Sequence, residues 1–396
     1  MKISRVRIYD VDYGTRFQGK WNPVIVQITT SSGLTGIGET ALAYGCGAKA
    51  ACQVLQEFAR EYLLGQDAGN IEGIWQTLFR KTFWGQSGGP IIYGAMSAID
   101  EALWDIKGRR LGVPVYELLG GGVNRRLRLY ANGWYDMGLK SPQEYAEGAL
   151  RVVADGFTAL KFDPFLITPD GRFEHPPRHI DRAWARLGIE RVRAVREAVG
   201  PAVDILVEIH GNLGTADAIL IGKELEQFHP YCYEEPVGPE NVDSMKKVSD
   251  NVNIPIAAGE RLYTRYGFRE YIEKQALDIL QPDIGLAGGF TEVRKIATHA
   301  ETYNLHVQPH NFGGPVGAAV AAQFDAATTN FIIQEWYPYD KTGHDAIVRE
   351  SYQKYYKNGW LDVPALPGLG LELNEDYLKQ FTCIEVKSSL GLARTA

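Results

Sequence analysis

The sequence has little cysteine and no long apolar run. The four cysteines, Cys46, Cys52, Cys232 and Cys383, form no Cys-x-x-Cys pair, which argues against a disulfide scaffold and favours a reduced, cytoplasmic setting. No apolar window approaches the roughly 20 residues that a membrane span requires. The N-terminal stretch MKISRVRIYDVDYG has no apolar segment behind its basic residues. The sequence therefore predicts neither a signal peptide nor a membrane protein.

Basic residues are also fewer than acidic residues. The net charge is −7 at neutral pH, so non-specific binding to nucleic acid is not expected. An anionic substrate is not excluded, because a bound metal ion can dominate the local electrostatics. The apolar, charged, Gly and Pro contents are ordinary for a globular protein. A chain of 396 residues is long enough for one α/β barrel of about 250 residues and a second domain.

The N-terminal third predicts an α+β domain. Three strands, SRVRIYDVDY, NPVIVQITT and LTGIGETAL, are followed by helical periodicity in KAACQVLQEFAREYLLG and IEGIWQTLFRKTF. A third helix, YGAMSAIDEALWDIKGRRLG, should end at Gly112 because Pro114 follows it. The Gly-rich segment LLGGGVNRRL marks the end of this domain, which we place at residues 1–122.

Alternating strands and helices follow this domain. Eight short apolar strands in such an alternation fit a closed parallel barrel better than an open sheet. The barrel is expected to span 123–360, with 361–396 packing back on the first domain. The polar stretch LITPDGRFEHPPRHIDRAW, residues 166–184, is predicted to contain an inserted loop over the barrel mouth, placed at 164–182. The predicted strands are LRLYANG, TALKFDP, DILVEI, PYCYEEP, IPIAAG, LDILQPD, LHVQPH and NFIIQEW.

Three glutamates recur at equal intervals in the barrel. Glu208, Glu234 and Glu260 are each 26 residues apart, which is close to the roughly 25 residues that one β/α unit occupies. Each one therefore follows a strand, and consecutive strand ends meet at one face of a barrel. Three carboxylates without a basic partner repel one another unless a cation lies between them. Oxygen ligands of this kind favour Mg²⁺ over zinc or copper.

Ionisable residues end other predicted strands as well. A single polar residue at a strand end is more often a solvated loop residue, but a run of successive strands that end in this way favours an active site. His175 and His179 in the inserted loop are weaker candidates, as are Trp21 and Trp84, although all four could cover a substrate. The strand-end residues are Lys161, Asp163, Glu208, His210, Glu234, Glu260, Asp283, His310 and Glu335.

These residues can perform proton abstraction next to a carboxylate. Mg²⁺ bound by three carboxylates can hold a substrate carboxylate and stabilise the enediolate that forms when the α-proton leaves. His310, oriented by Asp283, is the predicted base, and His210 is the predicted acid for a leaving β-hydroxyl. Glu335 and Lys161 are expected to hydrogen-bond the substrate carboxylate or the enediolate oxygen. Asp163 is expected to orient or contact substrate.

The set resembles the enolase superfamily, and within it the mandelate racemase-like subgroup. The resemblance covers essentially the whole chain, including the GIGE and SAIDEALWDIKG stretches. It implies an α+β capping domain, completed by the C-terminal tail, over a (β/α)7β barrel, and a homo-oligomer. It also implies one Mg²⁺ per subunit on Glu208, Glu234 and Glu260. The same resemblance assigns the His-Asp dyad to Asp283 and His310, and the acid that assists the enolate to Glu335.

Finer motifs resemble the gluconate and galactonate dehydratases. These motifs are LYANGWY, ALKFDPF, VDILVEIHG, EEPV and GERL. Such enzymes remove water from an aldonic acid and leave a 2-keto-3-deoxy acid. Two departures stand out. Lys161-Phe162-Asp163 stands where many members of the subgroup have Lys-x-Lys, whose second lysine is a base. The absence of that lysine argues against racemisation. Glu208 stands where many members have Asp, and its extra methylene shifts the metal or the strand slightly.

Dehydration of an aldonate is therefore the function predicted from the sequence. A cycloisomerase acting on a sugar lactone, or an epimerase that uses Lys161 with His310, is the nearest alternative. A catalytically inactive sugar-acid binder is a third, against which the intact set of ligands and acid/base groups argues. The identity of the sugar acid stays open, because it depends on the poses of the loops at 14–22, 82–90 and 164–182.

Overall fold

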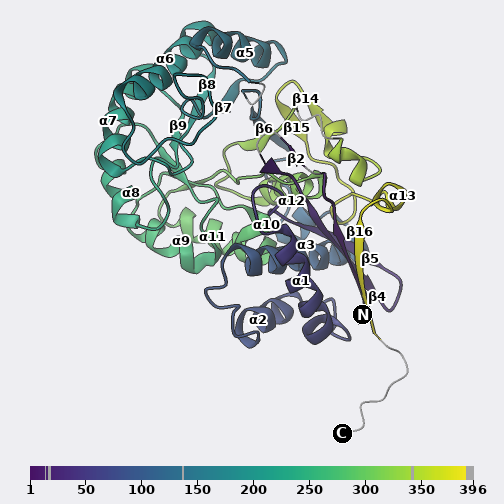
Figure 1. Ribbon diagram of the computed structural model, residues 1–396. Helices are drawn as coiled ribbons and strands as arrows, with labels where there is room; N and C mark the ends of the chain where they lie inside the picture. The colour runs from purple at the N-terminus through teal and green to yellow at the C-terminus, as the bar shows by residue number, and fades with distance from the viewer. Residues whose placement is uncertain (14, 17–18, 136–137, 340–342, 389–396) are drawn as a thin grey trace.

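The protein folds into a small α+β cap and a larger α/β barrel (Figure 1). The computed structural model describes residues 1–388 except 14, 17–18, 136–137 and 340–342. Within 14–20 it describes only the backbone of two short strands, β2 (Thr15–Arg16) and β3 (Gly19–Lys20). Much of the loop at 14–22, one of those expected to recognise substrate, therefore lies outside the described residues. Each helix in the described part of the chain is too short or too polar to traverse a bilayer.

The cap contains a four-stranded antiparallel sheet. Its order is β16-β1-β4-β5, and Gly33, at φ 83°, makes the turn of the β4–β5 hairpin. The last strand comes from the tail and pairs with the first, with Val386 opposite Val6. The three predicted strands and the return of the tail are confirmed. The strands are β1 (Ile3–Asp10), β4 (Val24–Thr30), β5 (Thr35–Thr40) and β16 (Thr382–Lys387).

Helix α3 (Gly89–Leu111) connects the cap to the barrel. It packs on β5 and α1 of the cap and on two barrel helices, α10 and α11, so most of its residues are buried. It ends at Gly112, which adopts a left-handed conformation with φ 71°, as the sequence predicts. The other helices of this part are α1 (Ala48–Phe58), a π-helical turn (Ala59–Leu63), α2 (Ile71–Lys81) and α4 (Val115–Leu119).

Eight parallel strands form the barrel. The ladder runs from β12 to β6, and β13 pairs with β6. Hydrogen bonds of Val307 with Asn330 and Ile332 join the two remaining edges, so the barrel is closed. The strands are β6 (Arg126–Ala131), β7 (Ala159–Phe162), β8 (Asp204–Glu208), β9 (Cys232–Glu234), β10 (Ile256–Ala258), β11 (Ile279–Leu280), β12 (His306–Val307) and β13 (Gln334–Trp336).

Helices surround the barrel as an outer arc (Figure 1). The start of α5 has a capping box, in which Ser141 and Glu144 satisfy each other's backbone N–H groups. Pro142 occupies the first turn of this helix, where no backbone N–H is needed. The helices are α5 (Pro142–Ala154), α6 (Arg182–Val199), α7 (Thr215–Leu225), α8 (Val242–Ser249), α9 (Thr264–Glu273), α10 (Ile284–Ala287), α11 (Gly289–Glu301) and α12 (Pro315–Ala327).

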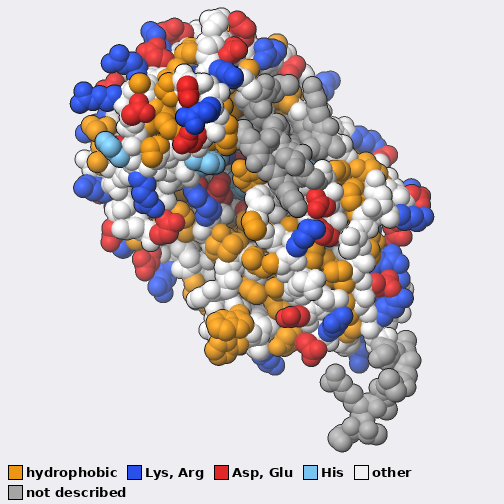
Figure 2. Space-filling view, viewed as in Figure 1, with side chains coloured by type: hydrophobic (Ala, Val, Ile, Leu, Met, Phe, Trp, Pro, Cys, Tyr) orange, Lys and Arg blue, Asp and Glu red, His pale blue; other side chains and the backbone are white. Residues whose placement is uncertain are grey.

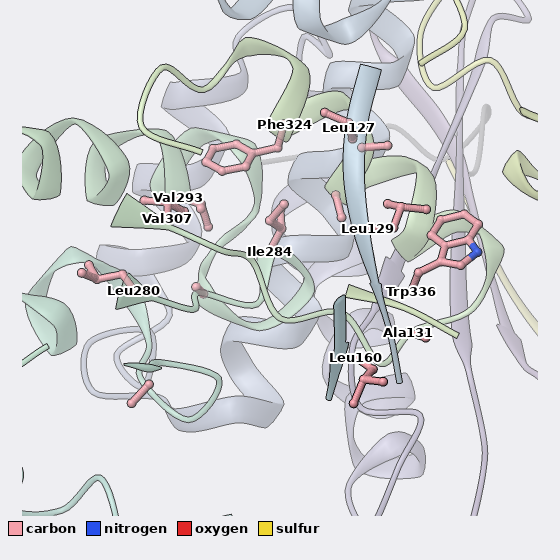
Figure 3. Packing of buried hydrophobic residues seen from close by; sticks show 14 of the residues in the cluster. Leu127, Leu129, Ala131, Leu160, Leu280, Ile284, Val293, Val307, Phe324 and Trp336 are labelled. Carbon is pink, nitrogen blue, oxygen red and sulfur yellow. The ribbon is translucent and has the colours of Figure 1, made fainter. Parts of the chain in front are cut away.

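The strands separate two apolar layers because successive side chains point to opposite sides. On β6, Leu127, Leu129 and Ala131 point outward and pack in the layer that includes Phe324 and Val293 of the helices (Figure 3). Tyr130 belongs instead to a separate cluster, which fills the barrel interior with residues of six strands and with Ile333, just before β13. This floor closes the barrel below the strand ends. The floor residues are Tyr130, Ala159, Leu206, Cys232, Ala257, Ile279 and Ile333.

The segment after the barrel folds back over β6. A short antiparallel pair, β14 (Tyr356–Lys357) and β15 (Trp360–Asp362), extends the sheet at that strand. One helix, α13 (Glu375–Leu378), precedes the return to the cap. The predicted fold class, an α/β barrel with an N-terminal capping domain completed by the tail, is confirmed. The division at 1–122, 123–360 and 361–396 stays a prediction.

Candidate active site

The three equally spaced glutamates converge at the carboxyl ends of adjacent strands. Glu208 ends β8 opposite Glu234 at the end of β9, and Glu260 follows β10 by two residues. One carboxylate oxygen of each lies within 4.8 Å of the others. Glu208 and Glu234 are fully buried, whereas Glu260 is partly exposed. The convergence that the 26-residue spacing predicts is therefore present, and the role of the trio as metal ligands stays a prediction.

The chemistry of this trio fits a divalent cation. Oε2 of Glu234 is buried and has no hydrogen-bond partner among the described residues. Burial and the neighbouring charge of Glu208 raise the pKa of Glu234 to about 8. A buried carboxylate oxygen without a partner is costly, and a cation bound by all three groups removes that cost. Three carboxylates suit a hard ion such as Mg²⁺.

Lys161 corrects one premise of the sequence argument. The trio has a basic partner, because Nζ of Lys161 at the end of β7 lies 2.5 Å from Glu234 Oε1 and 3.4 Å from Glu208 Oε2. The same ammonium is 3.0 Å from Glu335 Oε1. Burial opposes the charge of Lys161, but these carboxylates outweigh burial and raise its pKa well above the usual value. Lys161 therefore joins the predicted metal ligands to the acid of strand β13.

His310 and Asp283 form the predicted dyad. Nδ1 of His310 is 2.7 Å from Oδ2 of Asp283, and Nε2 is 3.4 Å from Oε2 of Glu260. Asp283 is buried, so it fixes the ring and directs Nε2 toward the trio. Burial lowers the pKa of His310, but the charges of Glu260 and Glu335 and the bond to Asp283 raise it to about 10. The structure thus brings these two residues together with a member of the trio.

His210 and Asp163 form a second dyad, which the sequence analysis did not pair. Nδ1 of His210 is 2.7 Å from Oδ2 of Asp163, and the other carboxylate oxygen accepts from the backbone N–H of Phe165 at 2.8 Å. His210 has φ 52°, a strained conformation in which its N–H donates to Glu208 Oε1 at 2.6 Å. Burial lowers the pKa of His210, but Glu208 and Asp163 raise it to about 10. Asp163 therefore orients His210, and a direct contact with substrate stays untested.

Glu335 is held by groups that the sequence analysis missed. The Asn132 side chain donates to Oε1 at 2.6 Å, and the backbone N–H of Asn311 donates to Oε2 at 2.8 Å. The side chain of Asn132 also donates to the Tyr337 hydroxyl at 2.7 Å. Burial raises the pKa of Glu335, but Lys161 and His310 lower it to about 2. Asn132 follows the first barrel strand, so a search for polar rather than ionisable residues at strand ends would have found it.

Arg261 is a second missed residue. It follows Glu260 in the GERL motif, and its guanidinium forms an ion pair with the buried Glu235, with Nε 3.2 Å from Oε1. Its Nε also lies 4.0 Å from Oε1 of Glu260. This cation partly balances the acidic rim beside the trio.

Over the face shown in Figure 2, basic and acidic side chains are intermixed with a few histidines, and no continuous basic stripe is visible among the coloured residues.

The two tryptophans and two loop histidines occupy different environments. Trp21 is buried against Tyr13 and His344, whereas Trp84 is 71% exposed and packs on Phe83. His175 lies beside His210, with the ring centroids 6.3 Å apart. His179 faces solvent and pairs with Asp217.

Two family descriptions match most of the chain. Residues 10–120 match the N-terminal domain of the mandelate racemase/muconate lactonizing enzymes. Residues 144–377 match the enolase C-terminal domain-like family. The chain belongs to the enolase superfamily. Both the cap and the barrel of this enolase superfamily member therefore have their counterparts in known proteins.

Relatives with solved structures or assigned activities agree. A member of the enolase superfamily from Salmonella Typhimurium is 42% identical, with a TM-score of 0.92 over 98% of this chain and all of that one. The D-galactonate dehydratase of Ralstonia pickettii (strain 12J) is 35% identical over 95% of this chain and 93% of its own length. The D-gluconate dehydratase of Thermoproteus tenax is 35% identical over 96% and 73%. These similarities place this enolase superfamily member among the dehydratases, a class of hydro-lyases.

Proposed function

We propose that the protein is a Mg²⁺-dependent dehydratase of an aldonic acid of the gluconate/galactonate class, which yields a 2-keto-3-deoxy acid. The observation that carries this proposal is the pair of His-Asp dyads around one acidic trio. His310 follows β12 and His210 follows β8, so the two imidazoles come from different parts of the rim. Each ring is held at Nδ1 by a buried aspartate, which leaves Nε2 for proton transfer. Elimination of water requires one group to take a proton and another to give one.

The residues divide the reaction between them. Nε2 of His310 takes the proton from the α-carbon, and the electron pair of that C–H bond forms the α,β double bond. The β-carbon–oxygen bond breaks, and the leaving hydroxyl takes a proton from Nε2 of His210 to depart as water. The resulting enol becomes the 2-keto acid when a proton adds at the β-carbon. Glu208, Glu234 and Glu260 would hold Mg²⁺.

Bound Mg²⁺ supplies positive charge that attracts the substrate carboxylate, stabilises the negative charge that develops as the α-proton leaves, and lowers the pKa of His310. Lys161 is placed to donate to a substrate oxygen from beside the trio. Asn132 and the N–H of Asn311 fix Glu335, which holds its carboxylate beside the ammonium of Lys161. The aldonate substrate is supported by the dehydratases named above, which act on D-galactonate and D-gluconate.

The test is a screen of four- to six-carbon aldonates and aldarates with purified protein and Mg²⁺ in D₂O. Mass spectrometry should find a 2-keto product from one acid, with loss of one water and with deuterium at the β-carbon. Deuterium at the α-carbon without loss of water would identify an epimerase instead. An isomerised lactone with conserved mass would identify a cycloisomerase. Either the epimerase result or the cycloisomerase result would reject dehydration.

Two broader predictions accompany this function. A homo-oligomer is proposed from the family resemblance, and a cytoplasmic location from the sparse cysteines. Sedimentation of the purified protein tests the first, and fractionation of cells that express it tests the second.

A further inference from the structure

The inserted loop between β7 and α6, residues 163–181, is fixed at several points. The fully buried Arg191 donates from Nη1 to the carbonyls of Pro164 at 2.6 Å and Ile167 at 2.8 Å. The backbone N–H of Thr168 donates to the Arg172 carbonyl, and the N–H of Arg172 donates to the Thr168 hydroxyl, each at 2.9 Å, which closes a hairpin turn. On the far side of the loop, the N–H of Gly214 donates to the Arg178 carbonyl at 2.7 Å. The loop therefore presents its side chains from a defined position.

His175 is the loop residue that comes closest to the second dyad. Its ring is edge-on to His210, with an interplanar angle of 77° and a centroid separation of 6.3 Å. Phe173 of the same loop also contacts the ring, with the ring centroids 5.5 Å apart. Nδ1 of His175 lies 3.4 Å from the side-chain nitrogen of Asn212, two residues after His210. His175 is an exposed residue, and its ring thus lies at the surface beside the strand end that carries the predicted acid.

The tautomer of His175 follows from its neighbour. The Asn212 nitrogen can only donate, so Nδ1 of His175 accepts and the ring hydrogen lies on Nε2. Burial and the positive charge of His210 lower the pKa of His175, which keeps the ring neutral near pH 7. His175 therefore offers one N–H donor beside His210 without adding a charge. A neutral donor of this kind suits a hydroxyl group rather than a carboxylate.

We infer that His175 is a specificity residue that binds a hydroxyl group beyond the β-carbon of the sugar acid. The inference rests on the proposed dehydration, in which His210 marks the position of the β-hydroxyl. The ring of His175, next to that of His210, is then expected to contact the part of the substrate beyond the β-carbon. His175 takes no part in proton transfer, so it contributes only when the substrate carries a hydroxyl beyond the β-carbon.

His179 provides a matched control within the same loop. It is also a histidine hydrogen-bonded through Nδ1, in this case to Asp217 at 2.9 Å, but its side chain is 92% exposed. A substitution there changes the same residue type in the same loop without approaching His210. The two histidines therefore separate a specific effect of His175 from a general effect of loop mutation.

The experiment compares two acids with the same configuration at the α- and β-carbons. One is the aldonate that the wild-type protein dehydrates, and the other is the matching 2,3-dihydroxybutanoate, which has no further hydroxyl. His175→Phe should lower kcat/KM for the aldonate about fivefold to tenfold, the size of one neutral hydrogen bond, mainly through KM. It should leave kcat/KM for 2,3-dihydroxybutanoate within twofold of wild type. His175→Gln, which keeps a donor, should recover most of the loss, and His179→Phe should change neither acid.

Two outcomes would overturn the inference. Equal losses on both acids would make His175 a general structural or catalytic residue, and no loss on either would remove it from the site. In both cases wild-type turnover still supports the proposed function. If the wild-type protein forms no 2-keto product from any aldonate, the proposed function itself fails, and the role of His175 fails with it.

Discussion

The cap and the barrel mouth both bury several carboxylates, but they give them different partners. In the cap, the partners are mostly backbone N–H groups. Asp105 accepts from Ile37 at 3.0 Å and from Leu369 at 2.8 Å, and Glu101 accepts from Glu39 at 2.8 Å. Such donors are fixed by the fold and cannot change charge. These carboxylates therefore tie strand β5 and the C-terminal segment to helix α3.

At the mouth, the partners are side chains that carry or exchange protons. Asp283 and Asp163 each hold a histidine, and Glu234 and Glu335 share Lys161. Burial and a raised pKa do not separate the two regions, because Asp100 in the cap and Glu234 at the mouth have pKa values raised to about 7 and about 8. The partners separate them. A buried carboxylate bonded mainly to backbone N–H groups supports the fold, and one that faces histidine or lysine side chains is a candidate for chemistry.

Removal of the metal ion should affect the carboxylates of the barrel mouth and not those of the cap, and this is the largest effect that we expect. We expect a chelator to reduce dehydration to background and added Mg²⁺ to restore it. Mg²⁺ should also raise the Tm, since an ion at 100 times its Kd stabilises the folded state by about 2.7 kcal/mol. Calorimetry with and without Mg²⁺ measures this shift. The shift should shrink in Glu234→Gln and persist in Asp105→Ala. An equal shift in wild type and Glu234→Gln would remove the trio from the metal site.

Loss of the base should remove activity without affecting the fold. His310→Asn should lower kcat by roughly 10²- to 10⁴-fold, the usual contribution of a general base. His306→Asn, at the exposed start of the same strand, should keep wild-type kcat. Steady-state assays of both variants, with circular dichroism to verify folding, provide the measurement. Full turnover by His310→Asn would show that another group takes the α-proton.

A cap carboxylate should give the opposite pattern. Asp105→Ala leaves the N–H groups of Ile37 and Leu369 without an acceptor and Arg109 without its partner, which should lower the free energy of unfolding by about 3 kcal/mol. Denaturant titration measures that loss, and kcat per folded molecule should not change. Asp376→Ala, at an exposed ion pair with Lys379, should leave the free energy of unfolding close to that of wild type. A stable but inactive Asp105→Ala would contradict the structural role.

The smallest expected effect is a pH dependence from Asp100. Burial raises its pKa to about 7, above the value near 4 of an unfolded chain. Between these values the folded protein holds a proton that the unfolded chain has lost, so stability falls as pH rises. This group should contribute a loss of about 2 kcal/mol between pH 5 and pH 7. Asp100→Asn resembles the protonated form, so its denaturation profile should lack that loss, and parallel profiles would disprove it.

Part of this site could be predicted from the sequence because it depends on chain geometry. Each β/α unit returns the chain to the same face, so a 26-residue spacing was enough to bring Glu208, Glu234 and Glu260 together. The dyad of Asp283 and His310 could be predicted for the same reason, with support from the family resemblance. The strand assignments depended on short apolar runs bounded by turn residues, and all eight predicted strands are present in the barrel.

The rest could not be predicted because it depends on side-chain direction and on distant pairing. The spacing places Lys161 at a strand end but does not show that its ammonium points across the barrel to Glu234 and Glu335. The pairing of Asp163 with His210 requires the left-handed backbone at His210, and no motif marks that conformation. Likewise, no local signal in residues 382–387 identifies β1 as their partner.

The pairing of β16 with β1 sets an order of assembly during synthesis. Residues 3–10 leave the ribosome early, yet their neighbour in the sheet, 382–387, emerges only after the whole barrel has been made. Until then one edge of the sheet has unpaired N–H and C=O groups, which other chains can bind. Closing a loop of that length costs little more entropy than closing one half as long, so the delay is kinetic rather than thermodynamic. The barrel is thus available as a folded support before the cap is complete.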